Sequence, residues 1–533
     1  MKSKGIGPDG RVVTFIDMGT NSIRILVVRL NPNHSYTILT RQKQQVRLGE
    51  GEFEDDEITP QAMDRAVMVA KTFVDLARTF HTEEFVAVAT SATREASNQN
   101  ELLHRIRQEA QLDVRVISGR EEARLVYLGV VSGTHIGNRN VLCIDIGGGS
   151  TEIAIGDSRD YRQLDSFRLG AIRLSNLYAG KGSRGVVSPE QYRKIQQHIR
   201  NAIVHSVAAL RKFKPDCAIG SSGTIMNLAE IAEKALHTPG KTPSGASGPA
   251  LSYKDLKKVI EILCPLTLAQ RRKVPGMNPE RADIIIAGAA ILETFMKELD
   301  LGEIAITGRG LQDGLLVDYL SRMDNFPMLG ELSPRQRSVL QLGRSCGINE
   351  VHARTVTSLV LEMFDSAKAG QLHDFSDTAR ELLEYATFLH DIGSFISYTN
   401  HHAHSYYIIR NSELLGFNEK EVQFMAMLAR FHRKKTPRKK DPGIMEMDAR
   451  EQQGLLLLSC FIRLGESLDR SHTALVQHVR FTAASRTNVH LEIIARGDCQ
   501  LELWGIESEK KAFEKAFGRK LVFDIVDSRQ NEK

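Results

Sequence analysis

Two acidic residues each follow a short apolar run and stand immediately before a glycine-rich turn. Asp17 precedes the segment MGTNS, and Asp145 precedes IGGGS, 128 residues further along the chain. Glycines let the backbone turn tightly and aim successive N–H groups at an anion, and short hydroxyl side chains add donors. The repeat therefore indicates two phosphate-binding turns rather than two plain β-hairpins, which would not need the acidic residue. The residues expected to bind phosphate are Gly19, Thr20, Asn21, Ser22, Gly147, Gly148, Gly149 and Ser150.

A pair of glutamates opens a helix in the segment ISGREEARL, residues 117–125. Ser118 and Glu121 have the spacing of a capping box, which assigns Glu121 to the helix end. Glu122 lies in the same first turn without such a role. A carboxylate beside phosphate-binding turns can accept the proton of an attacking water. The alternative is that Glu122 only complements the positive end of the helix dipole.

Carboxylates at the same turns could hold a metal ion. Asp145 ends one strand and Glu152 begins the next, so a hairpin brings both to one loop end, while Asp17 approaches from the other turn. Phosphoryl transfer requires charge on the phosphate oxygens to be neutralised, and Mg²⁺ binds through few carboxylates together with substrate oxygens. We therefore expect Mg²⁺ or Mn²⁺ at Asp145 and Glu152, with Asp17 either a further ligand or a structural residue.

A third loop is expected to line the same cleft. Residues 220–224, GSSGT, follow a strand and open a helix. The N-terminus of a helix binds anions through its free N–H groups. The phosphate contacts expected here are Gly220, Ser222, Gly223 and Thr224.

The elements that position these residues also repeat. After each turn come two further β runs, and then helices alternate with strands. Such alternation builds a mixed sheet with helices on both faces, so the duplication places two turns across one cleft. The first half is predicted to contain strands at 23–30, 36–46, 85–90 and 114–117 and helices at 60–80, 100–110 and from 121; the second half, strands at 151–156, 163–174, 217–220 and 303–307 and helices at 189–213, from 224 and near 280–298.

Six motifs occur in an order that resembles the exopolyphosphatase/guanosine pentaphosphate phosphohydrolase (Ppx/GppA) family. They are IDMGTNSIR, SATREA, ISGREEARL, IDIGGGSTE, GSSGT and NPERADIIIAG, between about residues 12 and 320. The resemblance implies an α/β fold of tandem actin-like ATPase (ribonuclease-H-like) lobes, as in actin, sugar kinases and heat-shock ATPases.

The same resemblance implies roles for single residues. It maps the water-activating base onto Glu122, a phosphate contact onto Arg94, and an arginine near the phosphate path onto Arg281. It also supports Asp145 and Glu152 as functional. The sequence departs from the family at Gln312, where family members usually carry arginine, and this departure puts a substrate contact of that loop in question.

Histidines gather in the last third of the chain, where the pattern is helical. Nine of the seventeen lie between His352 and His478, and His352 lies on an apolar helical stripe, facing inward. The order of His352, His390, Asp391 and Asp469 resembles an HD-type helical domain, in which imidazoles and carboxylates bind divalent ions. The resemblance implies either a second metal site at these four residues or a helical domain of HD descent without one, used for binding or assembly.

Two segments near the C-terminus have distinct compositions. Residues 430–440, RFHRKKTPRKK, are either a solvated loop or a track that attracts a long polyanion. Residues 481–533 are predicted to form a small α/β appendage with strands at 489–495, 499–506 and 520–526 and one helix at 508–517.

The whole chain has the composition of an ordinary globular protein, with 533 residues, 42% hydrophobic, 25% charged and a net charge of +5. It has no apolar run of about 20 residues and no apolar signal region, and its six cysteines form no CxxC pair. We expect a cytoplasmic protein that forms a homodimer, without membrane or nucleic-acid partners. The expected domains are lobes I and II at 1–136 and 137–322, the HD-like domain at 323–480 and the appendage at 481–533.

The expected function is that of an exopolyphosphatase, in which water activated by Glu122 releases terminal phosphates from inorganic polyphosphate. The runner-up substrate is pppGpp, alone or together with polyphosphate; the basic run at residues 430–440 favours the longer chain. An ATP-dependent phosphotransferase is a third possibility, against which stand the SGREEARL and SATREA motifs. A regulator with a dead site that binds polyphosphate or an alarmone is a fourth, against which stand the acidic residues Glu122, Asp145 and Glu152.

Overall fold

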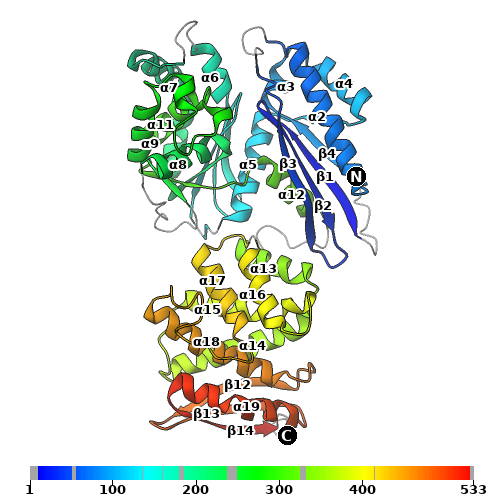
Figure 1. The fold of residues 1–533 in the computed structure, drawn as a ribbon, viewed down its shortest axis with the longest axis vertical. Helices are drawn as coiled ribbons and strands as arrows, with labels where there is room; N and C mark the ends of the chain where they lie inside the picture. The colour runs from blue at the N-terminus through cyan, green and yellow to red at the C-terminus, as the bar shows by residue number, and fades with distance from the viewer. Residues whose placement is uncertain are drawn as a thin grey trace. The chain divides into compact units, whose positions relative to one another are not determined.

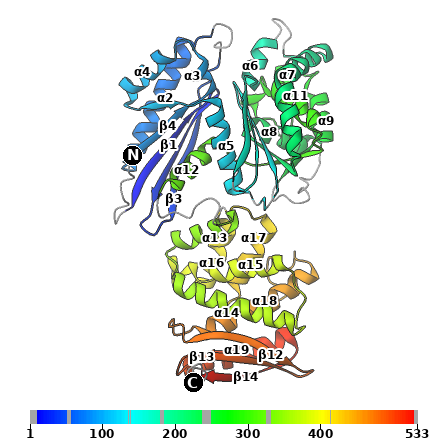
Figure 2. The ribbon, with the colours of Figure 1, turned by 180° about the vertical axis from the view of Figure 1, so that it is seen from behind.

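The structure is a computed structural model, and it describes residues 10–50, 56–134, 136–137, 139–158, 160–178, 185–236, 249–323, 332–412 and 414–527. The chain forms two compact units, Met1–Pro334 and Arg335–Lys533 (Figures 1 and 2). Among the described residues, no helix combines the length and the apolar character that crossing a bilayer requires.

Each half of the first unit is built on a mixed sheet. In the first sheet the strands follow the order β3-β2-β1-β4-β5, and in the second β10-β11-β9-β6-β7-β8. Three antiparallel strands thus precede a parallel crossover in both halves, and this shared order confirms the predicted tandem lobes. The strands are β1 Arg11–Met18, β2 Ser22–Leu30, β3 Tyr36–Gln45, β4 Glu84–Ala89 and β5 Val114–Val116, then β6 Val141–Ile146, β7 Thr151–Gly156, β8 Tyr161–Phe167, β9 Cys217–Ser221, β10 Ala250–Ser252 and β11 Glu303–Ile306.

Two helices, α5 (Gly119–Gly133) and α12 (Leu311–Ser321), lie between the sheets in both views (Figures 1 and 2). They approach closely because of glycine: a Cβ on Gly129 would lie 2.2 Å from the carbonyl oxygen of Gly310. One hydrophobic core contains side chains of both sheets and of both helices, so the predicted lobes 1–136 and 137–322 share their packing. The other helices are α2 Pro60–Thr79, α3 Ser91–Glu95, α4 Gln99–Ala110, α6 Ala171–Tyr178, α7 Pro189–Leu210, α8 Ser222–Ala235, α9 Tyr253–Leu263, α10 Leu268–Arg271 and α11 Ile285–Glu298, with 3₁₀ turns η1 Arg211–Phe213 and η2 Pro279–Arg281.

The strand predicted at 163–174 is wrong in its second half. The strand β8 ends at Phe167, and α6 begins at Ala171. The chain turns at Gly170, where a Cβ would lie 2.1 Å from the carbonyl oxygen of Gly148. Only glycine fits this close approach to the glycine-rich turn.

The second unit is helical and ends in a small sheet. Its helices and its sheet of order β12-β13-β14 share one hydrophobic core. The sheet begins at Val476, ahead of the predicted boundary at 480/481. Its elements are α13 Pro334–Ser345, α14 Glu350–Ala369, α15 Asp377–Phe388, η3 Ile392–Phe395, α16 His401–Asn411, α17 Glu419–Arg430, α18 Ala449–Leu468, β12 Val476–Ala484, β13 Asn488–Ala495, α19 Gln500–Phe517 and β14 Lys520–Asp527.

The strand predicted at 499–506 is wrong, because α19 covers these residues. The segment CQLELWGI alternates apolar and polar residues at its start, which is typical of a strand. In the helix, Leu503, Ile506 and Phe513 are buried on one face while Trp504 is 61% exposed. The helical period therefore decides which side chains enter the core.

Candidate active site

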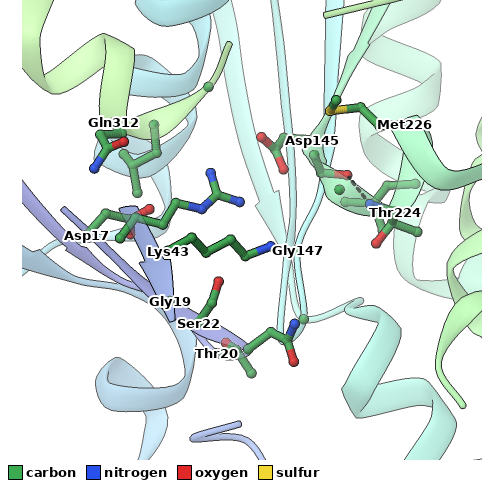
Figure 3. A pocket seen from close by; sticks show the side chains of 18 of the residues that line it. Asp17, Gly19, Thr20, Ser22, Lys43, Asp145, Gly147, Thr224, Met226 and Gln312 are labelled. Carbon is green, nitrogen blue, oxygen red and sulfur yellow. Dashed lines mark hydrogen bonds between the residues drawn. The ribbon is translucent and has the colours of Figure 1, made fainter. Parts of the chain in front are cut away.

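The first unit contains a cleft of about 590 Å³ that is lined by both glycine-rich turns (Figure 3). The two turns touch: a Cβ on Gly148 would lie 3.1 Å from Cβ and Cγ2 of Thr20. The structure thus places the repeated turns on facing sides of one cleft. The lining includes every residue predicted for these turns, namely Gly19, Thr20, Asn21, Ser22, Gly147, Gly148, Gly149 and Ser150.

The two turns are closed by the same hydrogen bond. The backbone N–H of Gly19 donates to the carbonyl of Ser22 (3.0 Å), and that of Gly147 donates to the carbonyl of Ser150 (2.9 Å). The strands that leave each turn are antiparallel, so the acidic residue before the turn faces a partner on the next strand. The two glycine-rich segments, which have the same pattern in the sequence, thus fold into turns of the same geometry.

Paired side chains form one row on each sheet beside the turns. In the first sheet Asp17 pairs with Arg24, and Arg24 pairs with Lys43 on the next strand. Directly paired residues of neighbouring strands point to the same face of a sheet. All three residues line the cleft, and Figure 3 shows Lys43 reaching toward the turn at Gly147. The first half therefore contributes two cations beside a single carboxylate.

The corresponding row of the second sheet is acidic. Asp145 pairs with Glu152, and Glu152 pairs with Ser166, whose hydroxyl donates to the Glu152 carboxylate (2.8 Å). Glu152 stands 128 residues after Arg24, the same offset that separates Asp17 and Asp145. The duplicated framework thus holds a carboxylate at one equivalent position of both walls, Asp17 and Asp145, and opposite charges at the next, Arg24 and Glu152.

Sequence reasoning missed Arg24 and Lys43. The signal was present in the repeat, since the residue equivalent to Glu152 is Arg24. Burial, together with the charges of the neighbouring Arg281 and Arg24, lowers the pKa of Lys43 to about 8. Lys43 therefore lies among other cations, in surroundings that an anionic ligand would stabilise.

Glu122 lies in the first turn of α5 and lines the cleft. Burial raises its pKa to about 7, and the charge of Arg94, with Nη1 3.0 Å from Oε2, opposes this rise. Its neighbour Glu121 behaves differently: the Ser118 hydroxyl accepts the Glu121 N–H (3.2 Å), but the Glu121 carboxylate pairs with Arg124 (2.9 Å). Only the Ser118 half of the predicted capping box therefore forms. Of the two adjacent glutamates, Glu122 is the one that faces the cleft.

Arg94 and Gly220 are not among the residues that line the cleft. Arg94 lies behind Glu122 and donates from Nη1 to the carbonyl of Ile117 (2.9 Å) as well as to the Glu122 carboxylate. Its predicted contact with phosphate stays a prediction, while its contact with Glu122 is direct. Gly220 packs against Ile225 and Ile304 below the loop.

The GSSGT loop and Arg281 meet at the cleft wall. Ser222 has a φ of +90°, a strained value for a residue other than glycine, and such strain concentrates at functional sites. Arg281 is buried rather than exposed and lies against Gly223, where a Cβ would lie 2.2 Å from Arg281 Nη2. The predicted residues Ser222, Gly223, Thr224 and Arg281 all line the cleft.

Gln312 also lines the cleft, at the start of α12 (Figure 3). Its Nε2 is buried without a hydrogen-bond partner. A buried amide donor without a partner is costly unless a ligand satisfies it. The loop therefore presents a free donor to the cleft even though it lacks the expected arginine.

Carboxylates that line the cleft could hold a divalent cation. Asp17, Glu122, Asp145 and Glu152 are among them, and Asp17 Oδ1 is buried without a hydrogen-bond partner. Burial raises the pKa of Asp17 to about 6 and that of Asp145 above its usual range. The pKa of Glu152 is raised well above its usual range by burial and by the charges of Glu122 and Asp145. A cation bound among these oxygens would remove their mutual repulsion.

The second predicted metal site lies in the helical unit. His352, His390 and Asp391 come together there, and their fourth neighbour is Glu466. Asp469 instead accepts a hydrogen bond from Nδ1 of His352 (2.7 Å). The structure thus brings the four predicted residues together, with Asp469 one step behind the cluster.

Two family models together match most of the chain. The model of the Ppx/GppA phosphatase family matches residues 26–323, and that of the Ppx/GppA phosphatase domain III matches residues 335–510. A crystal structure of an exopolyphosphatase from Cytophaga hutchinsonii is 28% identical, with a TM-score of 0.53, over 60% of this chain and 100% of that one. A crystal structure of an exopolyphosphatase-like protein is 26% identical, with a TM-score of 0.51, over 58% of this chain and 99% of that one.

Proposed function

Because the chain belongs to the Ppx/GppA phosphatase family and is a hydrolase of phosphoanhydride bonds, we propose that it releases terminal phosphates from inorganic polyphosphate. The observation that carries the proposal is the placement of Glu122. This buried carboxylate faces a cleft between two phosphate-binding turns, and its pKa of about 7 suits a general base at neutral pH.

In the proposed reaction, different residues of the cleft bind the phosphate chain and activate the attacking water. Backbone N–H groups of the turns, with Arg24 and Lys43, hold the last phosphates of the chain. Glu122 takes a proton from water as the water oxygen attacks the terminal phosphorus, and the bond to the bridging oxygen breaks. Orthophosphate leaves, the shortened chain keeps the bridging oxygen, and Arg94 holds the Glu122 carboxylate in place.

Asp145, Glu152 and Asp17 are the residues that would hold Mg²⁺ in this cleft. When bound, the ion would neutralise negative charge on the phosphoryl oxygens. The serine hydroxyls that hold two of these carboxylates, Ser221 on Asp145 and Ser166 on Glu152, fix their orientation.

Phosphate release from polyphosphate and from pppGpp, measured side by side with Mg²⁺, tests the proposal. We expect release from polyphosphate with the higher kcat/KM. Release from pppGpp alone would assign the runner-up function. Transfer of label from ATP to an acceptor, without release of phosphate, would identify a phosphotransferase. Binding of polyphosphate without release of phosphate would identify a regulator.

If a metal ion binds in the cleft, its effect on the thermal stability of the protein should depend on pH. Burial raises the pKa of Asp17 to about 6 and that of Glu122 to about 7, above the usual values of about 4 for exposed carboxyl groups. Between these values the folded state binds more protons than the unfolded state, so the free energy of unfolding falls as pH rises through this window. A cation competes with those protons, so Mg²⁺ should raise the melting temperature more at pH 8 than at pH 5.

Thermal unfolding at the two pH values, with and without Mg²⁺, measures this difference. Glu152→Gln should reduce it, while Asp165→Asn, which changes a β8 carboxylate outside the cleft lining, should leave it intact. An equal or larger Mg²⁺ effect at pH 5 would contradict a cation site built from these carboxylates.

The exposed cations Arg438, Lys439 and Lys440 are proposed to attract long chains. Their joint change to glutamate should raise KM for long polyphosphate by about tenfold, because the loss of several favourable charges costs roughly 1.4 kcal/mol of binding free energy. The KM for tripolyphosphate should not change. The matched control reverses the charge of three lysines of α9 that are also exposed, Lys254, Lys257 and Lys258. Equal effects of the two triple variants, or equal effects on both substrates, would show that the exposed cations of residues 430–440 are only solvated.

A further inference from the structure

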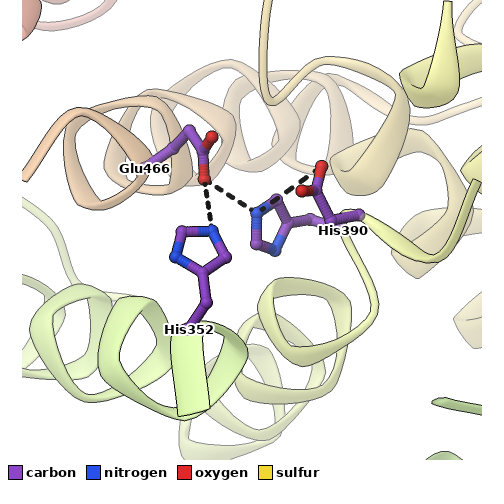
Figure 4. Close-up of side chains that lie close together, drawn as sticks. His352, His390 and Glu466 are labelled. Atoms are coloured by element: carbon purple, nitrogen blue, oxygen red, sulfur yellow. Dashed lines mark hydrogen bonds and ion pairs between the residues drawn. The ribbon is translucent and has the colours of Figure 1, made fainter. Parts of the chain in front are cut away.

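The helical unit contains two clusters of metal-binding atoms that share one carboxylate. One atom each of His352, His390, Asp391 and Glu466 lies within 4.8 Å of the others. Figure 4 shows three of these side chains converging from separate elements. One atom each of Asp391, His401 and His432 also lies within 4.8 Å of the others. Asp391 therefore stands between two sets of ligands.

Hydrogen bonds to backbone carbonyls fix the tautomers of three histidines. Nδ1 of His390 lies 2.5 Å from the carbonyl of Thr387, and Nδ1 of His432 lies 2.7 Å from that of Ala429. Nδ1 of His401 lies 3.0 Å from the carbonyl of Tyr398. A carbonyl oxygen only accepts, so the proton is on Nδ1 in each ring. Each neutral ring then has a lone pair on Nε2.

These Nε2 lone pairs face other acceptors, although that of His401 also lies 3.3 Å from the donor Nη1 of Arg433. Nε2 of His401 lies 3.2 Å from Nε2 of His432 and 3.0 Å from Oδ1 of Asp391. Nε2 of His390 lies 2.9 Å from Oε2 of Glu466, which is also 3.1 Å from Nε2 of His352. Acceptors that face each other at these distances repel unless positive charge lies between them.

A second layer of contacts supports the cluster. Asp469 accepts from Nδ1 of His352, and carboxylates or carbonyls that hold the second ring nitrogen orient metal-binding histidines. All four histidines are buried, and Asp391 Oδ1 is buried without a hydrogen-bond partner. The Asp391 and Glu466 side chains are 23% and 27% exposed. One side of the cluster is thus open, so that a cation can enter and water can complete its coordination.

We propose that the helical unit binds two divalent transition-metal cations bridged by Asp391. His352, His390, Asp391 and Glu466 hold the first, and Asp391, His401 and His432 hold the second. Imidazole-rich sites select ions such as Zn²⁺, Co²⁺, Ni²⁺ or Fe²⁺ over Mg²⁺. The three protein ligands of the second ion leave a position for water. This pair differs from the Mg²⁺ site of the cleft in its ligands and in the ions it selects.

The competing explanation is a cluster of protonated histidines paired with carboxylates and without metal. The number of metal ions bound per chain distinguishes these two explanations. The full chain, stripped with a chelator, is loaded with Co²⁺ in excess Mg²⁺, which occupies the carboxylates of the cleft, and is then desalted. We expect two Co²⁺ per chain, visible-range absorption bands of nitrogen-bound Co²⁺, and a higher melting temperature than that of the stripped protein.

The variants assign each ion to its ligands. Asp391→Asn should lose both ions and His432→Gln one, while His404→Gln, a change on α16 outside both clusters, should keep two. Failure of the wild-type chain to retain Co²⁺ would overturn the proposal, as would a content unchanged in His432→Gln. If Asp391→Asn does not fold, the wild-type stoichiometry and the Co²⁺-dependent melting temperatures of the two histidine variants decide.

Discussion

Glu122→Gln is expected to lower the turnover of polyphosphate by about 10²–10⁴-fold, the usual range for the loss of a general base. The amide has nearly the same shape but cannot accept the proton of the attacking water. The glycine-rich turns, Arg24 and Lys43 are unchanged in the variant, so binding of the chain should persist. The measurement is kcat together with the Kd for polyphosphate.

The chain provides a matched control for this variant. Glu121 is the preceding residue on the same helix turn, yet its carboxylate pairs with Arg124. Glu121→Gln should therefore retain turnover within a few-fold. Near-normal turnover of Glu122→Gln would remove Glu122 from the mechanism, and an equal loss in both variants would point to a damaged helix end.

Asp145→Asn is expected to lower turnover on the order of 10³-fold, since about 4 kcal/mol of charge stabilisation by a metal ion would be lost. The asparagine oxygen can still accept the hydrogen bond that the Ser221 hydroxyl donates to Asp145. The loop should therefore keep its shape while losing one negative ligand. The measurement is turnover as a function of Mg²⁺ concentration, and we expect the half-saturating concentration to rise at least about tenfold.

Asp165→Asn is the control, because Asp165 lies on β8 with Gln163 as its partner and does not line the cleft. It should leave both turnover and the Mg²⁺ requirement unchanged. A normal Mg²⁺ requirement in Asp145→Asn would exclude Asp145 as a ligand and leave the ion to Asp17 and Glu152.

The fold was predictable because the chain repeats itself. Asp17 and Asp145 with their glycine turns marked two equivalent positions, and the same order of strands follows in both halves. Local backbone chemistry determines such turns, so a short segment carries the information. The structure places both turns on one cleft for the same reason, since duplicated halves face each other.

Other parts of the site depend on contacts that no local pattern contains. Lys43 reaches the cleft because β3 pairs with β2 in a register that places it opposite Arg24. Arg94 was expected at the phosphate, yet tertiary packing places it behind Glu122. Likewise, Glu466 rather than Asp469 joins the histidine cluster, because it lies one helical turn earlier on α18. Register, packing and helix phase decide these positions.

The central claim is that the end of a polyphosphate chain lies between the two glycine turns, with the side chain at position 122 beside an attacking water. A crystal structure of the Glu122→Gln variant with Mg²⁺ and tripolyphosphate tests it most directly. We predict a terminal phosphorus held by N–H groups of residues 19–22 and 147–150, with a water between it and the side chain at position 122. A chain end bound outside this cleft would contradict the account.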